Sequence, residues 1–394
     1  MDGMNAPFRV GISGSYGGLN LGDEAILEGI IGELRRALPV EVTVFSRDPG
    51  DTLRRHRVER AVPVREFARD EILPELERLD LLILGGGGIL FDAEARIYLR
   101  EVSLAHELGV PVMVYAVSAG PLRTPHAQEI VRQALELATV VTVRDKPAKR
   151  LLEECGVRRP IEVTADPALL LQPAPLGPGA LAFEGLGGGR PARGTRTRVV
   201  GMSIREAGPA APDLNEAQVQ AQLADVADYV VDRLDADVVF VPMERAVQDM
   251  QQCHAVLARM RRVQRAHVLR GEYGAGELLS LISQFEFAIG MRLHFLIFAA
   301  LQRVPFVALP YSAKVSGFVE ELGLSLPPQS GLGTGRLIAH IDRAWDDKAQ
   351  TRAHIERELP RIQARSRRNG ELAAELLRAR ASRNAGEPTQ PAAH

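Results

Sequence analysis

Short apolar runs alternate with helical periods along most of the chain, and this alternation most limits the fold it can adopt. Such a rhythm predicts parallel strands flanked by helices. In the first half, strands are expected at residues 9–13, 42–45, 81–84, 112–116, 140–143 and 161–164. The rhythm resumes later, with strands expected at 199–204, 238–241, 267–269, 285–289 and 305–309. The sequence therefore predicts two α/β domains.

The chain of 394 residues is too long for one ordinary core and suits two domains. We expect the first domain at residues 8–171 and the second at 199–345. Residues 172–198 are rich in Pro, Gly and Arg, which is typical of an interdomain linker or a mobile loop. Helices that could cross back onto the first domain are expected at 346–381, followed by a disordered tail at 382–394.

Composition excludes several classes of protein. The formal charge of −2 and the lack of a basic block argue against nucleic-acid binding. Cys155 and Cys253 are too few for a disulfide framework and lack the spacing of a zinc site. Residues 1–7 lack the apolar core of a signal peptide, and no apolar run reaches the ~20 residues of a membrane span. We therefore expect a soluble, cytoplasmic protein without a metal.

An arginine and a histidine stand where an apolar strand turns into an apolar helix. Arg292 and His294 follow the expected strand at 285–289 and fall in the first turn of the next helix. In an open α/β sheet this turn opens the ligand crevice, and the N–H groups of a helix start favour a phosphate or carboxylate. Arg292 can hold either anion, and His294 can move a proton near neutral pH. Taken alone, the motif also allows a solvent-facing arginine and a core histidine.

Acidic side chains follow glycine-rich turns at two other expected strand ends. Residues 14–24 end in Asp23 and Glu24, which would repel a pyrophosphate, so this run is not a dinucleotide fingerprint. These carboxylates could contact sugar hydroxyls or act as a base, or they could only complement the helix dipole. Residues 85–92 place four glycines before Asp92, which is a candidate for sugar contacts or for capping.

Two further cations end strands on the same expected edge. Arg144 follows the strand at 140–143, where it could bind a ligand or only pair with a neighbouring acid. Lys314, one of four lysines in the chain, lies near a helix start, where a cation is favoured only beside an anion or an acid. Glu244 and Asp249 follow another strand, and neither acid alone indicates a site. The sequence contains no metal cluster, nucleophile elbow or P-loop motif.

Taken together, seven ordered segments resemble the polysaccharide pyruvyl transferase family, and above all its bacterial cell-wall branch. The segments are residues 17–27, 85–92, 115–122, 142–145, 164–168, 291–294 and 311–318. The likeness spans about residues 9–325. The sequence departs from the family pattern in the insert at 172–198 and at Ser118, where a glycine is expected.

The resemblance implies two facing Rossmann-like domains similar to the GT-B glycosyltransferase architecture, with the acceptor on the first domain and the donor on the second. It implies phosphoenolpyruvate as donor substrate, no cofactor, a sugar with two neighbouring hydroxyls as acceptor, and a ketal-linked pyruvate as product. Arg292 and His294 match the Arg-Leu-His motif that the family associates with the donor.

These implications suit the residues. Phosphoenolpyruvate needs at least two fixed cations, which Arg292 with Arg144 or Lys314 could supply. His294 would protonate the methylene carbon. Asp23, Glu24 or Asp92 would orient or deprotonate the acceptor; these acids are not distinguished by sequence.

The acceptor could be a free sugar or an oligosaccharide on a lipid carrier, which would bring the protein to the inner membrane face. Two alternatives stay open. One is a GT-B nucleotide-sugar glycosyltransferase, in which Arg292 and Lys314 would hold the diphosphate. The other is a non-catalytic sugar-binding or scaffold protein, which has no need to gather charge in one cleft.

Overall fold

The computed structural model describes residues 6–64, 68–92, 94–186, 198–206, 215–244, 248–309, 313–327 and 333–386. Contacts divide the chain into two compact units. Unit 1 comprises Met1–Gly18, Ile26–Leu170 and Gln363–His394, and unit 2 comprises Leu19–Ala25 and Leu171–Ile362. Each unit thus combines segments that are distant in sequence, so its bounds differ from those of the contiguous ranges 8–171 and 199–345.

Unit 1 is built on a parallel sheet with the strand order β3-β2-β1-β4-β6-β7-β8, and β5 pairs with β6. The order reverses between β1 and β4, where Val10 aligns with Leu81. Every side chain of β4 is buried, as expected for a parallel sheet covered on both faces. The strands are β1 (Phe8–Ser13), β2 (Val40–Ser46), β3 (Arg60–Pro63), β4 (Leu81–Leu84), β5 (Gly87–Leu90), β6 (Val112–Ala119), β7 (Val140–Val143) and β8 (Ile161–Val163).

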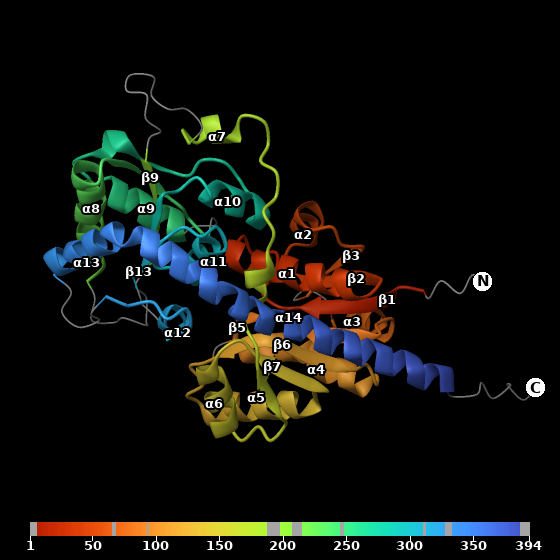
Figure 1. Cartoon of the computed structure of the whole chain (residues 1–394). Coiled ribbons are helices and arrows are strands. Elements are labelled where there is room, and N and C mark those ends of the chain that lie inside the picture. Colours follow the sequence, from red (N-terminus) through yellow and green to blue (C-terminus); the bar gives the residue numbers. More distant parts are fainter. Residues whose placement is uncertain are drawn as a thin grey trace, which may run out of the picture. The chain divides into compact units, whose positions relative to one another are not determined.

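Helices connect the successive strands of unit 1 except β4 and β5, and they cover the sheet (Figure 1). In α1, Ile26, Ile30 and Leu34 are fully or almost fully buried and form the apolar face that the sequence indicates. The helices are α1 (Leu21–Ala37, whose first turn belongs to unit 2), α2 (Pro49–Arg55), α3 (Arg69–Glu77), α4 (Ala95–Glu107), α5 (Pro125–Leu137), α6 (Lys146–Glu154) and the 3₁₀ turn Pro167–Leu170.

Unit 2 repeats the same topology with a parallel sheet in the order β11-β10-β9-β12-β13. Its strands are β9 (Arg198–Ser203), β10 (Ala236–Phe240), β11 (Ala266–Val268), β12 (Phe287–Gly290) and β13 (Phe306–Ala308). Its helices are α7 (Ala180–Phe183), α8 (Glu216–Arg233), α9 (Gln248–Leu257), α10 (Ala275–Ile282), α11 (Leu293–Leu301), α12 (Ala313–Glu321), α13 (Thr334–Asp346) and the 3₁₀ turn Val263–Arg265. The prediction of two α/β domains with parallel sheets is confirmed.

The last helix, α14 (Lys348–Gly386), passes from unit 2 to unit 1 after Ile362. In unit 1 it lies along the sheet (Figure 1), and Asn369 is fully buried there. The side-chain oxygen of Asn369 accepts hydrogen bonds from the hydroxyls of Thr142 (2.6 Å) and Thr164 (2.9 Å). Because buried polar atoms cost free energy unless paired, these bonds fix the helix to the ends of β7 and β8. The helix continues to Gly386, five residues into the tail expected at 382–394, and 387–394 lie outside the described residues.

Two glycine-rich segments are more ordered than the sequence suggests. Within residues 85–92, Gly87–Leu90 forms β5. A side chain on Gly85 would come within 2.0 Å of the Tyr16 hydroxyl, so protein atoms occupy that space. Within the expected linker at 172–198, residues 172–186 are described. There Glu184 is buried and accepts hydrogen bonds from Arg270 N and Gly271 N, which ties this part to unit 2.

None of the helices in the described ranges is both long and apolar enough to cross a membrane.

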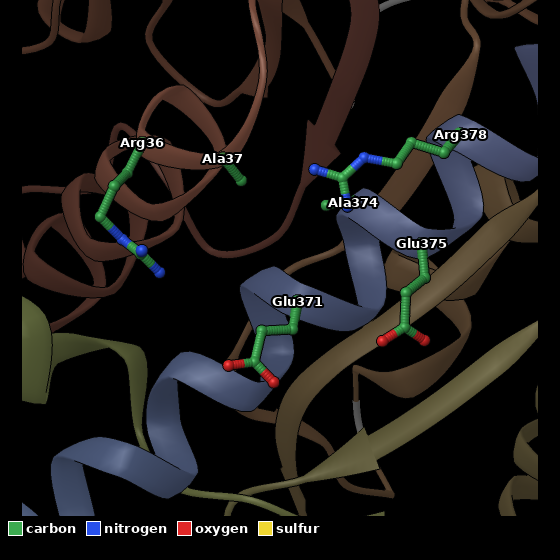
Figure 2. A pocket seen from close by; sticks show the side chains of 6 residues that line it. All are labelled: Arg36, Ala37, Glu371, Ala374, Glu375 and Arg378. Atoms are coloured by element: carbon green, nitrogen blue, oxygen red, sulfur yellow. The ribbon is translucent and has the colours of Figure 1, made fainter.

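A hollow of about 350 Å³ in unit 1 lies between the end of α1 and residues 371–378 of α14 (Figure 2). It is lined by Arg36, Ala37, Glu371, Ala374, Glu375 and Arg378. Because α1 leads back to the start of β2, its end marks the amino edge of the sheet, opposite to the edge where ligands bind in such folds. The charges that surround the hollow are mixed, and Arg36 is paired with Glu33 at 2.6 Å.

Candidate functional site

The strand order of unit 2 reverses between β9 and β12, and at such a reversal open α/β sheets bind ligands in a crevice outside the carboxyl ends of the strands. Ser203 of β9 aligns with Gly290 of β12, and the Met291 N–H donates to the Ser203 carbonyl at 2.8 Å. Helix α11 starts immediately afterwards, with Arg292 as its N-cap and His294 in its first turn. The structure therefore places this pair at the point where sequence and topology together expect a ligand.

Arg292 is held by two carboxylates. Its Nε donates to Asp249 Oδ2 at 2.9 Å, and its Nη2 donates to Asp249 Oδ1 at 2.5 Å. The same Nη2 donates to Glu244 Oε2 at 2.9 Å. The Arg292 side chain is 12% exposed, Glu244 is 31% exposed and Asp249 is fully buried. The guanidinium is thus fixed in direction, and two acids offset its charge.

Asp249 also binds the backbone at the end of β10. Its Oδ2 accepts hydrogen bonds from the N–H groups of Met243 and Glu244, both at 3.1 Å. The carboxylate therefore connects the loop after β10 with the start of α11. One turn further along α9, burial raises the pKa of the Cys253 thiol. Sequence reasoning did not assign Asp249, because its partner Arg292 lies far away along the chain.

The segment Leu19–Ala25 joins this site in unit 2. Asn20 forms an antiparallel bridge with Glu244, and the Leu21 N–H donates to the Met243 carbonyl at 2.8 Å. Gly22 lies directly against His294: a Cβ on Gly22 would be 2.1 Å from the imidazole Nδ1. The first turn of α1 is therefore held beside the first turn of α11.

This packing brings two of the predicted acids into the unit that carries Arg292 and His294. Asp23 is half-buried and Glu24 is 2% exposed, both in the first turn of α1. Lys314 is half-buried in the first turn of α12, in the same unit. The residues that precede it, 310–312, lie outside the described ranges, and with them Tyr311 and Ser312 of the sequence motif.

Arg144 belongs to unit 1 and is engaged in a buried ion pair. Its Nη1 donates to Asp166 Oδ2 at 2.6 Å, and the side chains are 5% and 6% exposed. Asp166 also accepts a hydrogen bond from Ala168 N at 3.0 Å, so the pair fixes the turn that follows β8. The sequence allowed Arg144 either to bind a ligand or to pair with a neighbouring acid, and in the structure it pairs with Asp166.

Asp92 is also in unit 1, and its carboxylate holds a loop. Its Oδ1 accepts hydrogen bonds from Arg123 N (2.8 Å), Thr124 N (3.0 Å) and the Thr124 hydroxyl (3.2 Å). These bonds, above all the one from Thr124 N, lower the pKa of Asp92. Thr124 in turn caps α5. Asp92 thus binds the residues that lead into α5, whereas the helix cap itself is Thr124.

Arg205 is a cation that sequence reasoning missed. It follows the end of β9 by two positions and is half-buried, and β9 is one of the two strands between which the strand order reverses. The signal that could have found it is an arginine just after an apolar strand, the same pattern that made Arg144 a candidate. Within the described ranges, no group of three or more His, Cys, Asp or Glu side chains could hold a metal ion.

Known structures share this fold at low sequence identity. The UDP-GlcNAc 2-epimerase from Neisseria meningitidis, solved with UDP-GlcNAc, is 10% identical with a TM-score of 0.61, and the match covers 94% of this chain and 99% of that one. The UDP-GlcNAc 2-epimerase from Methanocaldococcus jannaschii is 14% identical with a TM-score of 0.59, covering 85% and 91%. A mutant O-GlcNAc transferase from Thermobaculum terrenum is 16% identical with a TM-score of 0.50, covering 96% and 69%. These likenesses confirm the prediction of a GT-B-like fold.

Sequence comparison gives a more specific result. No curated protein sequence matches the chain. The model of one protein family does match, over residues 20–313, and that family is described as polysaccharide pyruvyl transferase.

Proposed function

This chain belongs to the polysaccharide pyruvyl transferase family, and from that premise we propose that it moves the pyruvyl group of phosphoenolpyruvate onto two hydroxyls of a cell-wall or exopolysaccharide sugar. The product is a pyruvate ketal, and inorganic phosphate is released. The observation that carries the proposal is the fixed pair of Arg292 and His294 at the start of α11, beside the reversal in strand order of unit 2.

The donor carries a phosphate and a carboxylate, so its charge must be met by several groups. Arg292 alone cannot do so, because Asp249 and Glu244 already offset its charge. The N–H groups at the start of α11 add a positive potential. Lys314 and Arg205, in the same unit, are the further cations we assign to the donor. Arg144 is the weaker choice, since it already pairs with Asp166.

The proposed reaction begins at the methylene carbon of the donor. The imidazolium of His294 donates a proton to that carbon, which becomes a methyl group, and the central carbon becomes electrophilic. A sugar hydroxyl bonds to the central carbon and gives its proton to a base. A second hydroxyl then bonds to the same carbon as the carbon–oxygen bond to phosphate breaks, and its proton leaves with the phosphate.

Asp23 and Glu24 are the acids we assign to the acceptor, because their turn lies against His294 through Gly22. Either could orient or deprotonate a sugar hydroxyl. Asp92 is the weaker choice, since its oxygens already bind backbone N–H groups. An acceptor on a lipid carrier would bring the protein to the cytoplasmic face of the membrane.

Calorimetric titration with phosphoenolpyruvate, and separately with UDP, tests the donor. We expect the wild-type protein to bind phosphoenolpyruvate, Arg292→Ala to bind it about a hundredfold more weakly, and His294→Gln to keep binding without turnover. Folding of each variant is checked by its thermal transition. Binding of UDP instead would move the protein to nucleotide-sugar glycosyltransferases, and binding of neither would favour a scaffold or an enzyme that needs its acceptor first.

A further inference from the structure

Asp249 is a buried acid whose contacts connect two elements of unit 2. It is fully buried in the first turn of α9 and receives N–H donors from two places, the loop after β10 and the guanidinium of Arg292. A buried carboxylate is stable only when charge and hydrogen bonds compensate it. Here the compensating charge is Arg292, a residue that the proposed function assigns to the donor.

The geometry of the contacts between Asp249 and Arg292 shows how Asp249 orients the guanidinium. Asp249 binds Nε and Nη2, which form one edge of the planar guanidinium, at 2.9 Å and 2.5 Å. Two bonds to one edge fix both the position and the plane of the group, whereas one bond would leave rotation. Glu244 contributes only one contact, on Nη2, and is 31% exposed. The orientation of Arg292 therefore depends mainly on Asp249.

We propose that Asp249 is a positioning residue for the donor site, which holds Arg292 in the orientation that binds the anion of the donor. This inference rests on the proposed function for the identity of that anion. Asp249 does not touch the donor itself; it acts through Arg292, which it fixes to the end of β10 through Met243 N and Glu244 N.

Unit 2 offers a matched control in Asp228. This carboxylate on α8 is 2% exposed and accepts hydrogen bonds from the N–H groups of Arg261 (3.0 Å) and Arg262 (2.7 Å) and from the Arg261 Nε (3.2 Å). Its bonding resembles that of Asp249. Its partners precede β11, however, at the amino edge of the sheet, away from the crevice. Asp228→Asn therefore measures the cost of losing such a carboxylate without touching the donor.

The test is a double-mutant cycle on phosphoenolpyruvate binding. We expect Asp249→Asn to weaken binding about ten- to hundredfold, the loss typical of one hydrogen bond to a charged group. Because Asp249 acts through Arg292, adding Asp249→Asn to Arg292→Ala should cost nothing further. Glu244→Gln should show a smaller loss in the same direction. Asp228→Asn should destabilise the fold and leave binding unchanged.

A second measurement separates this inference from the proposed function. The Nε–H signal of Arg292 is identified by NMR as the one lost in Arg292→Ala, and its exchange with water is followed without any ligand. We expect the Nε–H of Arg292 to exchange faster in Asp249→Asn than in the wild-type protein, and the increase in Glu244→Gln to be smaller. This result supports positioning even if the wild-type protein does not bind phosphoenolpyruvate. Unchanged exchange, wild-type binding in Asp249→Asn, or additive losses in the double mutant would each overturn the inference.

Discussion

Gly22 has no side chain, and the structure shows what one would do. Gly22 is in the first turn of α1, so alanine suits its backbone. A Cβ there would lie 2.1 Å from His294 Nδ1, 2.6 Å from its Cγ and 2.8 Å from its Cε1. Ordinary van der Waals contact begins near 3.4 Å, so the ring or the turn must move by about 1.3 Å. The substitution Gly22→Ala therefore displaces either the His294 ring or the first turn of α1.

A displacement of this size has a predictable cost. A catalytic group misplaced by about 1 Å can lose about a hundredfold in rate, which corresponds to about 2.7 kcal/mol in the activation barrier. We expect Gly22→Ala to lower kcat/KM for phosphoenolpyruvate by about that factor, measured as phosphate release with a cell-wall oligosaccharide acceptor. The imidazole NMR signals of His294 should shift in the same variant.

The matched control is Gly32→Ala in the same helix. A Cβ on Gly32 meets nothing within 4 Å, so the change should raise stability by up to about 1 kcal/mol through helix propensity and leave turnover unchanged. If Gly22→Ala turned over at the wild-type rate and left the His294 signals in place, the packing of the imidazole against this turn would be refuted as a requirement of the site.

Two further predictions concern buried groups. Asp166→Ala leaves the Arg144 guanidinium buried without its main charge partner and should destabilise unit 1 by about 3–5 kcal/mol in urea unfolding. Asp145→Ala removes a weaker contact to Arg144 at 3.7 Å and a helix cap, and should cost about 1 kcal/mol. Equal losses in the two variants would contradict the pairing of Arg144 with Asp166. Burial raises the pKa of both thiols, but Cys155 is half-buried and Cys253 fully buried. A thiol reagent at pH 8 should therefore modify Cys155 slowly and Cys253 only after unfolding, and equal rates in the folded protein would show that Cys253 is accessible.

The strands were predictable where side chains carry the signal. Val140–Val143 and Leu81–Leu84 match the expected ranges, because buried parallel strands are continuous apolar runs. β5 was not predictable in the same way, since Gly87 and Gly88 have no side chain to show a pattern, and the strand pairs with β6 at Gly87 and Leu90. Glu184 was missed because its N–H donors, at residues 270 and 271, come from a distant part of the chain.

The site was predictable in part. The position of Arg292 and His294 after an apolar strand indicated the start of α11, because that signal is local. The partners of Arg292 could not be found in this way, since Asp249 lies on another helix and the sequence does not state which acid faces which cation. The ion pair of Arg144 with Asp166 was equally hidden, because Arg144 follows its strand in the same pattern as Arg292.

The division of α14 bears on the order in which the protein can be made. Unit 1 includes the first residues of the chain and also Gln363–His394, where Asn369 binds Thr142 and Thr164. During synthesis, all of unit 2 therefore leaves the ribosome before unit 1 can be completed. The first domain begun is the last one finished, and a premature stop near the C-terminus would damage the N-terminal unit while sparing the one that carries Arg292.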